Sequence, residues 1–170
     1  MKRHPSLEDL SRDHFHALAQ AQEIRKTVEG ETGAHPLDEV ASQFLAFWHE
    51  DALPHFREEE EVLLPIYARH VLPSQDDHVR RMLDDHAWFR DVVFELERQV
   101  REGGEYHALL GEVGQRLAEH ARLEEREIFE RMQAVMTEGD LADVAERSLA
   151  FRHEWRHPEA IGRPRPGSGS

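Results

Sequence analysis

Apolar residues recur three and four positions apart along most of the chain, and this spacing is typical of amphipathic helices. The pattern predicts four long helices, over residues 6–29, 38–69, 77–101 and 105–136. A shorter amphipathic helix is expected over residues 140–155. No segment shows the alternation of a half-buried strand. The pattern therefore predicts an all-α protein.

Two local features concern the regularity of these helices. Pro54 lies inside the second predicted helix, where its missing N–H group and a steric clash predict a kink or a break. Pro65 is a second irregularity near the end of the same helix. Ser6 and Asp9 are interpreted as a capping box at the start of the first helix.

Four amphipathic helices joined by short loops pack most simply as an up-down-up-down antiparallel bundle. We therefore expect a four-helix bundle with a short C-terminal extra helix, forming one domain over residues 1–156. Residues 157–170 are predicted to form a disordered tail. From Gly162 onward this tail holds only Gly, Arg, Pro and Ser.

Composition excludes several classes of function. The formal net charge of −14 predicts no binding to nucleic acid or to an anionic membrane, because both would repel the protein. No stretch approaches the ~18 apolar residues of a membrane span. The chain has no cysteine, which excludes disulfides and thiolate metal sites. The N-terminus lacks the apolar segment of a secretory signal, so a cytoplasmic protein is expected.

Six polar side chains occupy positions where the helical pattern calls for core residues. They are His14, His55, Glu59, His86, His120 and Glu124. In two helices a Glu follows a His by four residues, so both side chains lie on one helix face. Antiparallel packing places all six within roughly two helical turns of one level. The sequence thus predicts a polar cluster inside an apolar bundle.

Bound metal ions would explain this cluster, because buried carboxylates without partners are costly. Imidazole and carboxylate ligands suit iron, manganese and zinc. Six ligands are too many for one open site, so we expect two ions bridged by the glutamates. His16 is an alternative to His14 if the first helix is rotated. Glu60 is expected on a solvated face, with a role behind the ligands as the alternative.

At these residues the chain resembles the hemerythrin-like, HHE cation-binding family, over about residues 6–136. The matching pieces are Asp13-His14, the segment from Leu53 to Pro65, Asp85-His86 and the segment from His120 to Glu125. The resemblance implies a four-helix bundle around a non-haem diiron centre. It implies the same six residues as ligands and two iron ions as the cofactor, with zinc and manganese as alternatives.

The chain departs from oxygen-carrying hemerythrins at two ligand positions. Arg90 stands where those proteins have a second His one turn after His86. Glu124 follows His120 by four residues, where they carry an Asp at five. The resemblance therefore implies that one ion has fewer protein ligands than in an oxygen carrier. This leaves room for solvent, peroxide or nitric oxide.

We expect a protein that binds or reacts with oxygen, peroxide or nitric oxide, in a sensing, storage or detoxifying role. The alternative is an iron- or oxygen-responsive regulatory protein, or a structural metal-binding bundle without turnover. Apolar residues one turn above and below the ligands are expected to line a small pocket. They are Leu10, Ala17, Ala52, Val62, Met82, Phe89 and Leu117. The sequence leaves open whether the protein is an enzyme and whether it binds a protein partner or a second copy.

Overall fold

The computed structural model describes residues 2–157 and contains helices and connecting loops, with no strand in that part of the chain. Its helices are α1 (Glu8–Val28), α2 (Leu37–Phe47), α3 (Leu53–Glu58), α4 (Leu64–Tyr67), α5 (Asp77–Glu102), α6 (His107–Leu123), α7 (Phe129–Val135) and α8 (Glu138–Arg156). Short 3₁₀ turns, η1 (Pro5–Leu7) and η4 (Pro73–Gln75), precede α1 and α5. The predicted all-α fold is confirmed.

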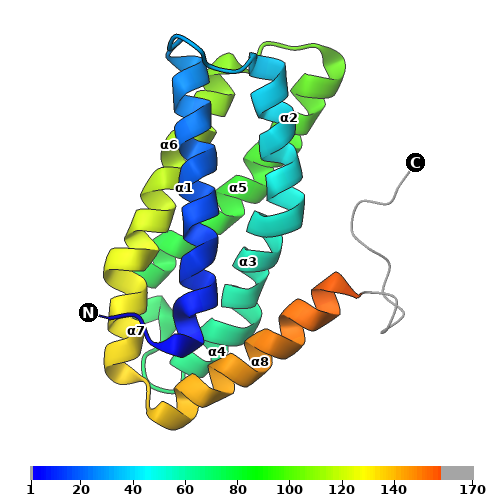
Figure 1. The fold of residues 1–170 in the computed structure, drawn as a ribbon. Coiled ribbons are helices and arrows are strands. Elements are labelled where there is room, and N and C mark those ends of the chain that lie inside the picture. Colours follow the sequence, from blue (N-terminus) through cyan, green and yellow to red (C-terminus); the bar gives the residue numbers. More distant parts are fainter. Residues whose placement is uncertain (1, 158–170) are drawn as a thin grey trace.

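Three π-helical segments join the shorter helices into long rods. Segments η2 (Trp48–Ala52) and η3 (Glu59–Leu63) connect α2, α3 and α4, and η5 (Glu124–Ile128) connects α6 to α7. The rods α1, α2–α4, α5 and α6–α7 run side by side, and the chain reverses in the loops between them (Figure 1). Helix α1 contacts α2 and α6, and α5 contacts the same two helices.

Helix α8 confirms the predicted C-terminal helix. It crosses the lower end of the rods in Figure 1 and contacts α3, η3 and α4. Leu141 and Val144 are buried there, whereas Leu149 is exposed. None of the helices among the described residues has the length and apolar character needed to cross a membrane. Of the predicted tail, residues 158–170 lie outside the described residues.

Of the kink or break expected at Pro54, a break does not occur, because the helical rod continues through this residue, and the irregularity takes the form of a π-helical turn before it. Each proline is the second residue of the α-helical segment that follows a π-helical turn. Leu53 donates its N–H to Trp48, and Leu64 donates its N–H to Glu59, each five residues back. The wider turns change the hydrogen-bonding register immediately before the residue that lacks an N–H. The prolines therefore cause no break.

The predicted capping box at Ser6 and Asp9 is also wrong. The chain enters α1 through the 3₁₀ turn η1, and Nδ1 of His4 accepts a hydrogen bond from the Ser6 N–H. Asp9 instead pairs with Arg12 on the surface. A capping box is present at α8, where Thr137 and Asp140 exchange hydrogen bonds.

The core consists of two apolar clusters separated along the rods. One contains Ala17, Phe56, Phe89 and Ala121, and the other contains Leu10, Val62, Met82 and Ile128. On every rod, the polar positions predicted from the sequence lie between a member of the first cluster and a member of the second. The fold thus encloses a polar layer between two apolar layers.

Candidate metal centre

All six predicted polar residues are buried and lie together. They come from α1 (His14), α3 (His55), η3 (Glu59), α5 (His86), α6 (His120) and η5 (Glu124). Glu59, His86 and Glu124 are 0% exposed. His16, the alternative to His14, is exposed on the surface. The structure therefore brings together the six residues that the sequence singled out.

The two glutamates link two pairs of histidines. Glu124 places Oε2 2.8 Å from Nε2 of His14 and Oε1 3.1 Å from Nε2 of His120. Glu59 places Oε1 3.4 Å from Nε2 of His55 and Oε2 3.3 Å from Nε2 of His86. Each carboxylate therefore faces one histidine of each pair.

These contacts define two groups of potential ligands that share both glutamates. One group is His14, His55, Glu59 and Glu124, and the other is Glu59, His86, His120 and Glu124. Within each group the ligand atoms all lie within 4.8 Å of one another. A pair of cations with two bridging carboxylates fits this arrangement.

Several buried atoms of the cluster have no hydrogen-bond partner of good geometry. They are both carboxylate oxygens of Glu59 and of Glu124 and the Nε2 atoms of His86 and His120. Leaving such atoms unpaired inside a protein is costly. All of them are aimed at the centre of the cluster, where metal coordination would satisfy them. The donor set of nitrogen and oxygen atoms suits iron, zinc or manganese.

The electrostatics of the cluster also call for positive charge at its centre. Burial would raise the pKa of Glu124, but the electrostatic influence of His120 and contacts with His14, His55 and His86 hold that pKa well below its usual value. Burial opposes charging of His86, yet contacts with Glu124 and Glu59 raise the pKa of His86 to about 10. The buried carboxylates thus favour the protonated form of His86 in the metal-free chain, and a bound cation would replace that proton.

Each histidine turns its other ring nitrogen, Nδ1, towards an outer carboxylate. The Nδ1-to-oxygen pairs are His14 with Glu125 at 2.8 Å, His86 with Glu60 at 2.8 Å, His55 with Asp13 at 3.2 Å and His120 with Asp85 at 3.4 Å. Such a partner fixes the orientation of a metal-ligating imidazole and increases its basicity. It also directs each Nε2 towards the centre.

Sequence reasoning placed Glu60 on a solvated face and gave no role to Asp13, Asp85 or Glu125. The sequence did hold a pattern that could have pointed to these four carboxylates. Each glutamate of the cluster is followed by a second Glu, and two of the histidines follow an Asp. Each Asp serves the histidine of the next rod, and each second Glu serves a histidine from the other half of the chain.

A small cavity of about 20 Å³ adjoins the cluster. Three of the predicted pocket residues, Ala17, Ala52 and Leu117, line it together with Phe47 and Phe56. Four other predicted pocket residues do not line this cavity and are buried in the two apolar clusters: Leu10, Val62, Met82 and Phe89. The volume is enough for one water-sized molecule.

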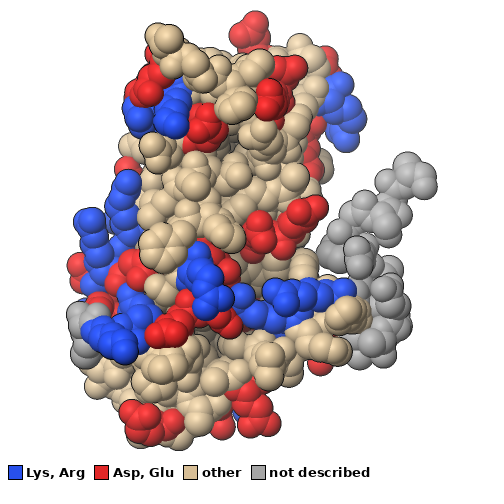
Figure 2. Space-filling model, in the orientation of Figure 1, with Lys and Arg blue, Asp and Glu red and all other residues tan. Residues whose placement is uncertain are grey.

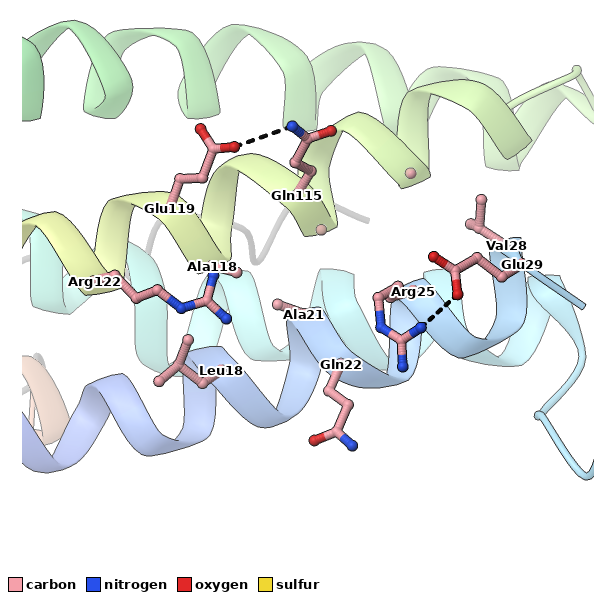
Figure 3. A pocket seen from close by; sticks show the side chains of 12 residues that line it. Leu18, Ala21, Gln22, Arg25, Val28, Glu29, Gln115, Ala118, Glu119 and Arg122 are labelled. Carbon is pink, nitrogen blue, oxygen red and sulfur yellow. Dashed lines mark hydrogen bonds and ion pairs between the residues drawn. The ribbon is translucent and has the colours of Figure 1, made fainter. Parts of the chain in front are cut away.

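A larger hollow of about 740 Å³ lies between α1 and α6 and is separate from the histidine cluster. Leu18, Ala21 and Ala118 contribute apolar atoms to it. Figure 3 shows an Arg25–Glu29 ion pair at one end and a Gln115–Glu119 hydrogen bond along α6. No histidine lines this hollow, so it offers no imidazole ligands for a metal ion.

Comparison with known families gives one result. The model of the hemerythrin HHE cation binding domain matches residues 6–132, a range that includes all six residues of the cluster. No curated protein and no solved structure matches the chain.

Proposed function

The chain belongs to the hemerythrin HHE cation-binding domain family, and on this basis we propose that its buried cluster holds two iron ions. We further propose that the four rods form an up-down-up-down antiparallel four-helix bundle around them. The contacts of α1 and α5 with both α2 and α6 support this arrangement.

The sharing of both glutamates between two histidine pairs is the observation that carries the proposal. His14 and His55 would hold one ion, and His86 and His120 would hold the other. Glu59 and Glu124 would bridge the two. Two nitrogens and two bridging carboxylates leave each ion with open coordination positions, because a non-haem iron site commonly holds more than four ligands.

We propose that a small oxidant, namely oxygen, peroxide or nitric oxide, occupies the open positions. The adjoining cavity of about 20 Å³ has room for a molecule of this size and excludes a bulky substrate. Phe47 and Phe56 form apolar parts of its wall. When bound, iron supplies the change of oxidation state. Arg90, at the position of a ligand in oxygen carriers, bonds Glu60 instead, which argues against reversible oxygen carriage.

Anaerobic loading with iron(II), followed by each oxidant in turn, tests this proposal. We expect about two iron ions per chain by elemental analysis, and ligand-to-metal absorption bands after at least one oxidant. An iron-loaded protein whose optical spectrum does not change with any oxidant would contradict the redox role. Elemental analysis of protein purified from its native host distinguishes iron from zinc and manganese.

Glu124→Leu tests the bridging role directly. Because Glu124 faces histidines of both pairs, we expect the variant to lose most of both ions. Leucine fills a similar volume and introduces no polar atom of its own. Glu127→Leu is the matched control, since Glu127 is exposed in the same π-helical segment. Equal metal content in the two variants would show that Glu124 is not a ligand.

A regulatory role without turnover is the second candidate, and α8 supports it. This helix lies beyond the matched residues 6–132 and contacts α3 and η3, which carry His55 and Glu59. Loss of metal would loosen this contact and change the exposed surface. Amide hydrogen exchange in α8 that is equal with and without metal would contradict this role.

The remaining expectations also stand as proposals. With a formal net charge of −14, we propose that the protein binds neither nucleic acid nor anionic membranes and works in the cytoplasm. Association with a protein partner or a second copy is open to measurement by sedimentation of the metal-loaded chain.

A further inference from the structure

Each outer carboxylate of the cluster is itself contacted by an arginine. The pairs are Arg3 with Glu125 at 2.6 Å, Arg152 with Asp13 at 2.7 Å, Arg90 with Glu60 at 2.9 Å and Arg116 with Asp85 at 2.7 Å. Every histidine therefore begins a chain of contacts that runs from imidazole to carboxylate to guanidinium. Four arginines balance the charge of the four outer carboxylates.

The two histidine pairs obtain their arginines from different parts of the chain. Arg90 and Arg116 lie inside the matched residues 6–132, and they serve His86 and His120. Arg3 and Arg152 lie outside that range, one before it and one after it, and they serve the other pair. Only the pair of His14 and His55 thus has outer carboxylates that are held by arginines from outside the matched range.

Arg152 connects α8 to His55 through Asp13. Its Nη2 donates a hydrogen bond to Oδ2 of Asp13, the same oxygen that faces Nδ1 of His55. Its Nε lies 2.7 Å from Oε2 of Glu58, which is only 2% exposed. Figure 2 shows basic and acidic side chains close together where α8 crosses the rods. The guanidinium therefore ties the last helix to two carboxylates beside the cluster.

Arg3 reaches His14 by two routes. Its Nη2 donates hydrogen bonds to the carboxylate and to the backbone carbonyl of Glu125, whose Oε1 faces Nδ1 of His14. Its guanidinium also lies over the ring of Phe129, 5.2 Å from the centroid. Phe129 in turn stacks on the His14 imidazole. The first residues of the described chain therefore hold both the ring and its hydrogen-bond partner.

We propose that Arg3 and Arg152 are positioning residues that retain one of the two metal ions, the one held by His14 and His55. This inference rests on the proposed binding of two ions. Each arginine keeps an outer carboxylate turned towards its histidine, which keeps Nε2 directed at the ion. Two residues, one on either side of the matched range, thus control one ion selectively, and Arg90 and Arg116 control the other.

Release of iron(II) to a chromogenic chelator under anaerobic conditions tests the selectivity. In Arg152→Met we expect one of the two ions to leave roughly tenfold faster, the lower end of the effect of altering an outer partner of a metal ligand. The fast phase should hold half of the iron. In the double variant Arg3→Met/Arg152→Met, the fast phase should still contain only half of the iron, because both residues serve the same ion. Arg90→Met/Arg152→Met should release both ions fast.

Three further variants separate positioning from folding. Arg152→Lys keeps the positive charge and should restore slower release of the fast ion. Glu58→Gln, alone and combined with Arg152→Met, removes the effect of leaving Glu58 buried without its partner. Arg147→Met changes an exposed arginine of α8 and should release iron as the unaltered chain does.

Unchanged release from a folded Arg152→Met chain would overturn the inference while leaving the proposed function intact. Equal acceleration of both ions in Arg3→Met/Arg152→Met would overturn it as well. An unaltered chain that binds no iron would overturn both the inference and the proposed function.

Discussion

The histidines of the cluster use their two ring nitrogens for different tasks. Nε2 of each ring faces Glu59 or Glu124, and Nδ1 faces an outer carboxylate. Because an imidazole that donates from one nitrogen is a better ligand through the other, the outer carboxylates prepare the rings for metal. Phe56 stacks on His86 with centroids 3.9 Å apart and restricts that ring further.

The same contacts predict how the stability of the metal-free protein depends on pH. Contacts with Glu124 and Glu59 raise the pKa of His86 to about 10, from about 6.5 in the unfolded chain. A histidine whose pKa is raised by folding stabilises the folded protein fully at a pH below its pKa in the unfolded chain. This stabilisation is lost as the pH rises through the pKa of the folded protein. We expect the urea midpoint of the metal-free protein to fall between pH 7 and 10. A midpoint that rises over this range would contradict the account.

At this scale the six central residues could be predicted from the sequence, and the outer carboxylates could not. A helix rotates by about 100° per residue, so Glu60 points away from the direction of its neighbour Glu59. Whether that direction is solvent or another rod depends on the packing. In the structure it leads to His86 and Arg90 on α5.

The π-helical segments are the features of individual elements that periodicity could not reveal. His120, Glu124, Ile128 and Met132 follow one another at intervals of four residues. In an α-helix, four residues rotate the side-chain direction by about 40° more than one full turn. A wider turn reduces this drift and keeps the side chains on one face. Both glutamates of the cluster begin a π-helical segment, η3 or η5. Such segments are often found at functional sites.

Close packing of α1 against α6 gives a prediction for two glycines. A Cβ at Gly114 would lie 2.6 Å from Cγ2 and 3.0 Å from Cβ of Ile24, so Gly114→Ala should destabilise the protein by about 1–3 kcal/mol. A Cβ at Gly111 would lie 3.2 Å from the end of the Val28 side chain. Gly111→Ala is the matched variant and should be neutral or stabilising, by up to about 1 kcal/mol of helix propensity.

Thermal or urea unfolding of the metal-free variants measures this difference. Comparable stability of the two alanine variants would show that α1 and α6 do not approach as closely as the structure indicates. From the sequence alone, both glycines are simply residues of low helix propensity. The distance between α1 and α6 at each position decides which glycine is needed for close packing.

On the scale of the whole molecule, the chain forms two halves that meet at the polar layer. The order His, His–Glu, His, His–Glu gives each half two histidines and one glutamate, and each glutamate serves both halves. The spacing of apolar residues allowed the all-α fold to be predicted, and the histidines and glutamates at core positions allowed the central cluster to be predicted. The role of Arg3 and Arg152 could not be predicted, because both residues act only through contacts across the folded molecule.

Bound metal should therefore stabilise the molecule as a unit. Metal that binds only the folded chain adds about 2.7 kcal/mol at a free concentration 100 times its Kd. We expect anaerobic iron(II) to raise the melting temperature of the unaltered chain and to have little effect on Glu124→Leu. A similar increase in both proteins would show that iron acts outside the cluster.

The most direct measurement is anomalous X-ray diffraction at the iron absorption edge from crystals of the iron-loaded chain. The account predicts two peaks about 3.5–4 Å apart, the usual separation in two-metal sites. One should lie among His14, His55 and the two glutamates, and the other among His86, His120 and the same glutamates. A single peak, or peaks away from Glu59 and Glu124, would contradict it.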